Sequence, residues 1–234
     1  MSDLFEAKID LFEAECKENP VCQKIISPVK EYISGSAPGI KDYLTEKGLE
    51  KLELAIIRIE DFKSPQDYFE RTFSSKRRNE IRRTSKEGVY SRRLTGNEFN
   101  NHKDEIYQIH VSKSVRQGEM KSEFSEFPID EPILVCNYHN YLYYGSYNTE
   151  GLLVGYIKMA ICGGFADCSR LFGHCVQMNK FDFMRNLWVF MIEDIMINFK
   201  QIGYVCYDVM DTGGEGLINW KKSVGLKPVG FVLS

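Results

Sequence analysis

Apolar residues recur at helical spacing near the start of the chain. The positions are Phe5, Ile9, Phe12 and Cys16. Their 4-3-4 separation predicts an amphipathic helix, which Asn19-Pro20 should end, and a second short helix is predicted through Val29 and Ile33. We expect residues 1–49 to form a helical appendage packed on a main domain over 50–234. An apolar stripe left exposed for a partner is the alternative.

The middle of the chain alternates between strand and helix patterns. The predicted elements are a strand over 52–59, a helix from Ser64-Pro65 to Gly88, a strand over 89–94 and a helix over 98–114. Residues 116–132, with one glycine and two prolines, form an irregular segment. Loops of this kind often hold an acceptor substrate.

The pattern changes again after residue 140. Three β-rich runs over 141–147, 152–161 and 170–178 are separated by turn-like segments and predict an antiparallel meander. A helix over 183–202 follows, apolar nearly all round, so we expect protein to cover most of its sides. The last predicted elements are a strand over 204–210, a helix over 216–224 and a strand over 227–233.

Length and composition are those of a globular protein. The 234 residues include 43% hydrophobic and 13% aromatic residues, enough for the core of one large domain. No run approaches the roughly 20 apolar residues that cross a bilayer, and the first residues lack the basic and apolar regions of a secretory signal. We therefore expect a soluble, cytoplasmic protein without a membrane partner. The sequence does not indicate an oligomeric state.

Cysteine and histidine positions give no metal-binding pattern. The seven cysteines include no Cys-x-x-Cys pair, and several lie inside apolar runs, where a free thiol behaves as a small hydrophobe. The four histidines show no paired spacing with them. The sequence therefore predicts reduced core cysteines and no metal site.

A basic run over 74–93 stands out against the acidic remainder of the chain. It holds eight Lys or Arg and two Glu, whereas the whole protein has a formal charge of −3. Three interpretations remain open: a solvated, partly self-neutralised helix face, a surface that contacts the phosphates of a donor, or a grip on a nucleic acid through residues 76–93. No aromatic residue lies between Phe73 and Tyr90, which argues against a stacking platform for single strands.

The order of meander, long helix, strand, short helix and strand resembles the GNAT (Gcn5-related N-acetyltransferase) fold. Two segments are similar to the Fem-type peptidyltransferases and their acetyltransferase-like relatives. One is the basic helix, Ser-Lys-Arg-Arg-Asn-Glu-Ile-Arg-Arg-Thr-Ser-Lys-Glu-Gly-Val at 75–89. The other is Tyr207-Asp208-Val209-Met210-Asp211, followed by the Lys-x-x-x-Gly helix that contains Lys221 and Gly225. The resemblance covers roughly residues 50–234 and implies an α+β domain with a mixed, mostly antiparallel twisted sheet flanked by helices.

The resemblance also implies an activity, acyl transfer to the amine of a small molecule or peptide by direct attack. The donor would be acetyl-CoA or another acyl-CoA, or an aminoacyl-tRNA, and no metal is implied. The donor contacts would come from Cys175, Val176, Gln177, Met178, Lys180 and Arg185. One departure is that this loop lacks the glycines with which acetyl-CoA enzymes of the fold surround pyrophosphate. Fem-type proteins lack them as well.

Four residues are candidates for catalysis. The resemblance places Asp208 and Asp211 at the acceptor side, where either carboxylate could take the proton of the amine. The alternatives are a turn-orienting role for Asp208 and a helix cap for Asp211. His174 has a side chain suited to a base, and Tyr207 could protonate the leaving group, although each is also explained as a half-buried strand residue.

Polar residues near the irregular segment are candidates for binding the acceptor. They are His110, Arg116, Gln117 and Tyr144. Two other functions remain open at this point. One is a nucleic-acid-directed modifying enzyme that holds phosphate with the basic run. The other is a catalytically silent GNAT-like interaction module, suggested by the missing glycine loop.

Overall fold

A computed structural model describes most of the main domain and part of the preceding region. The described residues are 11, 16, 19–37, 40–48, 52–113, 125–132, 136–178 and 182–230. Seven strands form one sheet in the order β2-β3-β4-β5-β6-β1-β7. Their bounds are β1 (Glu53–Arg58), β2 (Tyr90–Leu94), β3 (His139–Tyr147), β4 (Leu153–Cys162), β5 (Phe165–Gly173), β6 (Tyr204–Val209) and β7 (Lys227–Gly230).

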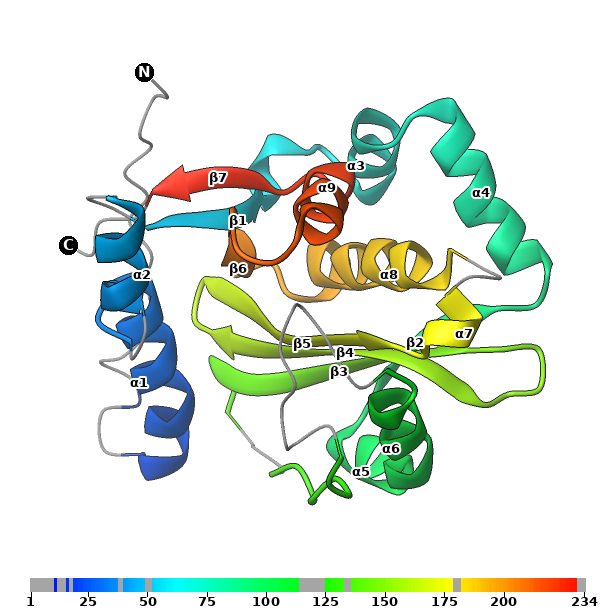
Figure 1. Ribbon diagram of the computed structural model, residues 1–234, viewed down its shortest axis with the longest axis horizontal. Helices are drawn as coiled ribbons and strands as arrows, with labels where there is room; N and C mark the ends of the chain where they lie inside the picture. The colour runs from blue at the N-terminus through cyan, green and yellow to red at the C-terminus, as the bar shows by residue number, and fades with distance from the viewer. Residues whose placement is uncertain are drawn as a thin grey trace.

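Neighbouring strands run antiparallel except β5 and β6, which are parallel. The predicted meander is confirmed as β3-β4-β5. The fold is the predicted mixed α+β architecture, with helices on both faces of an open sheet (Figure 1).

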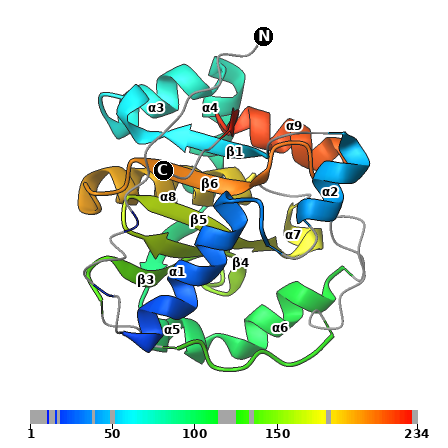
Figure 2. The same cartoon turned by 90° about the vertical axis from the view of Figure 1, so that its left-hand side faces the viewer.

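Helices cover the two faces in separate groups. One face packs against α8 (Phe183–Asn198), which α3 (Pro65–Thr72), α4 (Ser75–Lys86) and α9 (Glu215–Ser223) flank (Figure 1). The other face packs against α1 (Pro20–Ile33), α5 (Gly96–Asn101) and α6 (Lys103–Val111), and Figure 2 shows α1 lying across the strands. Strand β1 illustrates the division, because Ala55 and Ile57 enter the α8 core while Leu54 and Ile56 enter the α1 core. The sheet is therefore buried on both sides at its centre.

Two predicted helices are each divided in the structure. The helix expected from Ser64 to Gly88 is two helices, because Phe73 and Ser74 adopt extended backbone and the Ser74 hydroxyl accepts from Arg77 N–H at the start of α4. The helix expected over 98–114 breaks at His102, between α5 and α6. A capping serine inside a polar run explains the first break.

Other helix and strand boundaries differ from the predicted ones by several residues. The strand expected over 170–178 is β5, which begins earlier and ends at Gly173, and residues Cys175–Met178 form the short helix α7. Helix α8 ends at Asn198, before the expected 202. Helix α2 (Ile40–Lys47) had not been predicted. The second short helix is confirmed as α1, and most of the predicted first helix lies outside the described residues. None of the described helices has both the length and the apolar character required to cross a membrane.

Candidate active site

Strands β5 and β6 separate after three residue pairs. Phe165, Ala166 and Asp167 pair with Tyr204, Val205 and Cys206, and beyond them the two parallel strands share no further pair, although β5 runs to Gly173 and β6 to Val209. The divergence opens the sheet at the carboxyl ends of both strands. In open α/β sheets, ligands commonly bind outside such ends. We refer to this place as the β5–β6 split.

Asp208 lies at the split in a strained conformation. Its φ of 61° is the only positive value outside glycine among the described residues, and such left-handed backbone costs a non-glycine residue about 1–2 kcal/mol. This conformation directs the carboxylate of Asp208 toward three hydrogen-bond donors. Oδ1 accepts from Val209 N–H at 2.7 Å and from the Tyr32 hydroxyl at 3.1 Å, and Oδ2 accepts from the Thr212 hydroxyl at 2.6 Å. Both carboxylate oxygens are therefore engaged inside the protein.

Lys221 lies under Asp208 and is fully buried. Its Nζ donates to the carbonyls of Val209 at 2.5 Å and Thr212 at 3.0 Å, and lies 3.8 Å from Asp208 Oδ2. Burial lowers the pKa of Lys221, and the negative charge of Asp208 opposes that shift. The lysine of the Lys-x-x-x-Gly helix thus fixes the turn after β6, a role the sequence did not suggest.

Asp167 is the polar residue that sequence reasoning missed. It occupies the last pair of the β5–β6 ladder, opposite Cys206. Burial and then the nearby charge of Asp208 raise the pKa of Asp167 to about 7, while a hydrogen bond from Cys206 partly opposes them. A carboxyl that titrates near neutral pH is suited to accept a proton in catalysis. The available sequence signal was an acid inside an apolar run, which we had assigned to a turn.

A pocket of about 290 Å³ opens beside Asp167, between α1 and the face of β3, β4 and β5. Residues Lys24 to Tyr32 of α1 form one wall. The sheet contributes Tyr141, Lys158, Asp167 and Arg170. Lys158 is paired with Glu131 at 2.5 Å and stacks over Tyr141. The pocket therefore has a mixed lining that includes one carboxyl of raised pKa.

Helix α1 connects this pocket with the split. Tyr32 lines the pocket, and its hydroxyl donates to Asp208. Burial, followed by the charges around it, raises the pKa of Tyr32, so the phenol stays protonated at neutral pH. The helix predicted as an appendage thus forms part of the wall of the candidate site.

The predicted catalytic residues occupy different surroundings. Asp208 lies at the split, and Asp211 is exposed in the turn that follows it, near Tyr43 and Lys221. Tyr207 points to the other face of the sheet, where its ring packs between Trp188 and Trp220. His174 follows β5, and its backbone N–H donates to Val154 O at 2.8 Å. The sequence-based assignment thus combined residues from both faces of the sheet.

The predicted donor loop is partly occupied by contacts within the protein. Cys175 N–H donates to the Ser112 hydroxyl at 3.1 Å, and Met178 N–H donates to His174 O at 3.0 Å. Val176 is exposed and Gln177 is partly exposed, both in α7. Lys180 lies outside the described residues. The residues of α7 lie beyond the end of β5, about 20 Å along the strand from Asp167. A donor role for them remains a prediction.

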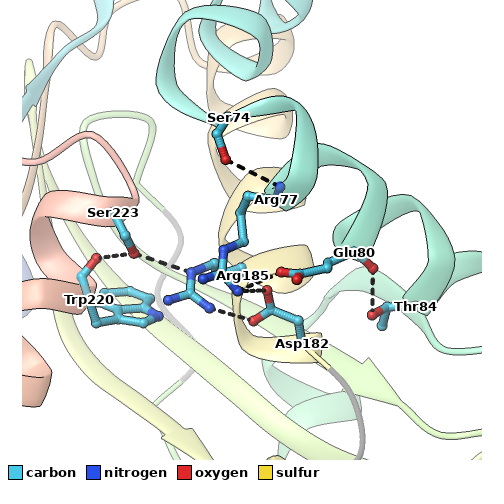
Figure 3. A network of polar contacts seen from close by, with 8 residues as sticks. All are labelled: Ser74, Arg77, Glu80, Thr84, Asp182, Arg185, Trp220 and Ser223. Carbon is cyan, nitrogen blue, oxygen red and sulfur yellow. Dashed lines mark hydrogen bonds and ion pairs between the residues drawn. The ribbon is translucent and has the colours of Figure 1, made fainter.

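Arg185 belongs to a network of charges at the start of α8 (Figure 3). Its guanidinium donates to Asp182 at 2.8 Å and to the Ser223 hydroxyl of α9 at 3.2 Å. Arg77 of α4 contacts the same Asp182 at 3.5 Å and Glu80 at 2.6 Å. Two arginines and two acids balance one another here. A phosphate would have to displace Asp182 from these arginines in order to bind them.

The basic run is largely paired within the chain. Acidic partners contact Arg77, Arg83, Arg92 and Arg93. Arg78 donates to the carbonyls of Glu70 and Phe73, and Arg82 lies over the Phe69 ring. In the described part of the chain, this leaves Lys76 and Lys86 as the exposed cations of the run without such a contact.

The predicted acceptor residues are not gathered at the split. His110 is buried on α6, with Nε2 2.7 Å from the Tyr156 hydroxyl. Tyr144 is buried beneath α8, and its hydroxyl donates to Asp194 at 2.9 Å. Arg116 and Gln117 lie outside the described residues. An acceptor role for these four remains a prediction.

Comparisons with known proteins connect this geometry to a fold. No protein-family model matches the chain, and no curated protein matches it. Among solved structures, FemX superposes with a TM-score of 0.51 at 8% identity, over 76% of this chain and 59% of FemX. L-PGS from Bacillus licheniformis superposes with a TM-score of 0.46 at 13% identity, over 76% of this chain and 58% of L-PGS. A GCN5-related N-acetyltransferase from Kribbella flavida superposes with a TM-score of 0.43 at 12% identity, over 82% of this chain and 61% of the acetyltransferase.

The similarity to FemX carries the assignment of the fold, which is GNAT-like, as the sequence resemblance implied. This chain spans about six tenths of the length of each of these three proteins.

Proposed function

We propose that the chain is an acyltransferase that moves an acetyl or aminoacyl group from an acyl-CoA or aminoacyl-tRNA to an amine. The observation that supports this most strongly is the β5–β6 split, with Asp167 at its base. The ladder between β5 and β6 ends beside a carboxyl that is half deprotonated near pH 7. Such a carboxyl is both a competent base and, once protonated, a group that returns its proton readily to water.

The proposed reaction is a direct displacement. The amine nitrogen attacks the acyl carbon, a C–N bond forms, and the C–S or C–O bond to the donor breaks. The amine proton passes to Asp167, directly or through one water, and then to solvent. The leaving thiolate or alkoxide takes a proton from solvent.

Asp208 and Lys221 have positioning roles in this proposal. The carboxylate of Asp208 accepts three hydrogen bonds, so it is poorly placed to receive a further proton from substrate. Its charge instead raises the pKa of Asp167. Asp211, although exposed, remains the alternative base in the turn after β6.

The pocket between α1 and the sheet is the proposed acceptor site. Asp167 lines it, so an amine bound there would lie beside its proposed proton acceptor. The acceptor would be a small molecule or the side chain of a peptide, since the volume of about 290 Å³ holds a group of that size.

Binding measurements test the proposal and separate the donors. We expect calorimetric titration to detect either acetyl-CoA or an aminoacyl-tRNA, and acylation of a panel of amines, followed by mass spectrometry, to identify the reaction. Binding of neither donor and no acylated product would contradict an acyltransferase. That outcome would favour a silent interaction module.

A further inference from the structure

Four potential metal ligands converge at the N-terminal end of α1, away from the β5–β6 split. They are Cys16, Cys22, Cys136 and His139. Cys16 precedes α1 and Cys22 lies in its first turn, whereas Cys136 precedes β3 and His139 is the first residue of that strand. One ligand atom from each lies within 4.8 Å of the others. The fold alone brings these segments together, which is why their spacing in the sequence gave no metal pattern.

Two of the six separations between these atoms are those of a tetrahedral zinc site. Cys16 Sγ lies 3.6 Å from Cys136 Sγ, and Cys136 Sγ lies 3.7 Å from His139 Nδ1. Zinc holds sulfur at about 2.3 Å and nitrogen at about 2.0–2.1 Å, so tetrahedral ligands are roughly 3.6–3.8 Å apart. The separations among Cys16, Cys136 and His139 therefore match those of zinc ligands, and Cys22 lies within 4.8 Å of them.

His139 has the orientation of a metal ligand. Its Nε2 lies 2.7 Å from the carbonyl oxygen of Leu11, and the ring is fully buried. A carbonyl only accepts hydrogen bonds, so Nε2 carries the proton and the lone pair of Nδ1 faces the thiols. Metal-bound histidines usually fix their second nitrogen in this way.

The sulfur of Cys136 is surrounded by donors. The backbone N–H groups of Tyr138 and His139 both donate to it, an arrangement that favours a thiolate. Cys22 is 1% exposed, so two of the four ligands are buried and the other two partly buried. Three thiolates and one imidazole, shielded from water, form a donor set that selects zinc over harder cations.

We propose that Cys16, Cys22, Cys136 and His139 bind one structural Zn²⁺ ion. Four protein ligands complete the tetrahedron and leave no position for substrate, so the role is structural and not catalytic. Binding releases up to three thiol protons to solvent as the cysteines become thiolates. The ion fixes the start of α1 to the start of β3 and thereby holds α1 across the sheet. This inference does not rest on the proposed transferase activity.

A disulfide is the competing explanation for the same cysteines. None of the seven cysteines forms a disulfide in the structure. A Cys16–Cys136 disulfide would use two sulfurs and leave Cys22 and the lone pair of His139 without a role. The metal uses all four groups, so we favour it.

Metal analysis of the full chain tests the proposal without reference to activity. The protein is purified in the presence of a reductant, supplied with Zn²⁺ and freed of excess metal. We expect about one zinc ion per chain by plasma mass spectrometry, the stoichiometry of one four-ligand site. Replacement of zinc by Co²⁺ should give the visible absorption of tetrahedral cobalt bound to thiolates. The variants Cys136→Ser and Cys16→Ser should lose most of the zinc.

Cys168→Ala is the matched control, because Cys168 lies in the α8 core outside the cluster and its loss should leave zinc content unchanged. Wild-type protein that stays without zinc after this treatment would overturn the proposal, as would a cobalt spectrum without thiolate bands. The proposal would also be overturned if Cys136→Ser and Cys16→Ser both retained as much zinc as the unaltered chain. The wild-type measurements decide the question even where a variant fails to fold.

Discussion

Two aspartates at the β5–β6 split differ in what surrounds them. Asp208 accepts three hydrogen bonds and lies near the buried ammonium of Lys221, whereas burial and the charge of Asp208 raise the pKa of Asp167 to about 7. Identical side chains thus receive a positioning role and a proton-accepting role.

A buried lysine gives the first prediction. Lys221→Met removes the donor to the carbonyls of Val209 and Thr212 and leaves them buried without it, which should destabilise the fold by about 1–3 kcal/mol. Urea unfolding measures the change. Lys222→Met, at the exposed neighbour on α9, is the control and should change stability little. Equal stability of both variants would contradict the role given to Lys221.

At the scale of single residues, the sequence predicted the position of Asp208 but not its partners. The Tyr-Asp motif drew attention to the end of β6. Tyr32 could not be connected with it, since 176 positions separate the two residues and the contact exists only after α1 docks. Asp167 was missed because its raised pKa arises from burial in the tertiary fold, which no local pattern encodes.

Two facing glycines let helix α8 approach the sheet. Gly155 of β4 pairs with Gly173 of β5, and a Cβ atom on Gly155 would lie 2.5 Å from the Phe183 ring and 2.8 Å from Met184 Sδ. A Cβ on Gly173 would also be too close to Met184, at 2.8 Å. The first turn of α8 therefore packs directly on the strands, next to α7 and the proposed donor contacts.

Gly155→Ala should consequently cost about 1–3 kcal/mol, because either the ring of Phe183 or the start of α8 must move. Gly216→Ala is the matched control, since no atom lies within 4 Å of the added methyl group and the residue is in a helix. That control should be neutral or slightly stabilising. Thermal unfolding of the two variants tests the contrast, and a stable Gly155→Ala protein would show that the close packing is not needed.

At the scale of elements, long periodic segments were predicted better than their ends. The meander, α8, β6 and α9 were all expected in the right order. The helix breaks at Phe73-Ser74 and at His102 were not, because neither is marked by a proline or glycine. No residue pattern within β5 or β6 indicates where the pairing between them stops.

At the scale of the whole molecule, the charge of the basic run over 74–93 indicates function less directly than the sequence suggested. The basic run is mostly neutralised by acids, carbonyls and rings of the same chain, with Lys76 and Lys86 as exposed exceptions among the described residues. Such a surface can make only a few phosphate contacts. It therefore supports the self-neutralised interpretation of the run more than a nucleic-acid grip.

Salt dependence tests this interpretation. Each phosphate contact contributes about 0.7–0.9 to the slope of log affinity against log salt, so we expect any RNA binding to show a slope of magnitude about 2 or less. Filter binding at several salt concentrations measures it. A slope of magnitude about 5 or more would contradict the pairing described here and would favour a nucleic-acid-directed enzyme.

Helix α1 connects the two proposed sites across the molecule. Its first turn supplies Cys22 to the zinc cluster, and its last turn supplies Tyr32 to Asp208 (Figure 2). The region expected from the sequence to be an appendage thus contributes to both. Both contributions of α1 depend on tertiary contacts. Apolar spacing in the sequence could therefore predict only a packed helix.

The central claim, that Asp167 accepts the proton of the amine, is tested most directly by the pH dependence of acyl transfer. With the amine acceptor and donor identified, kcat/KM should show a limb that rises with pH through about 7, as Asp167 loses its proton, in addition to the titration of the amine itself. Asp167→Asn should lower kcat/KM by about 100-fold and remove that limb, leaving only the titration of the amine itself. An Asp167→Asn enzyme with unchanged rate and profile, or loss of the limb in Asp211→Asn instead, would contradict the account.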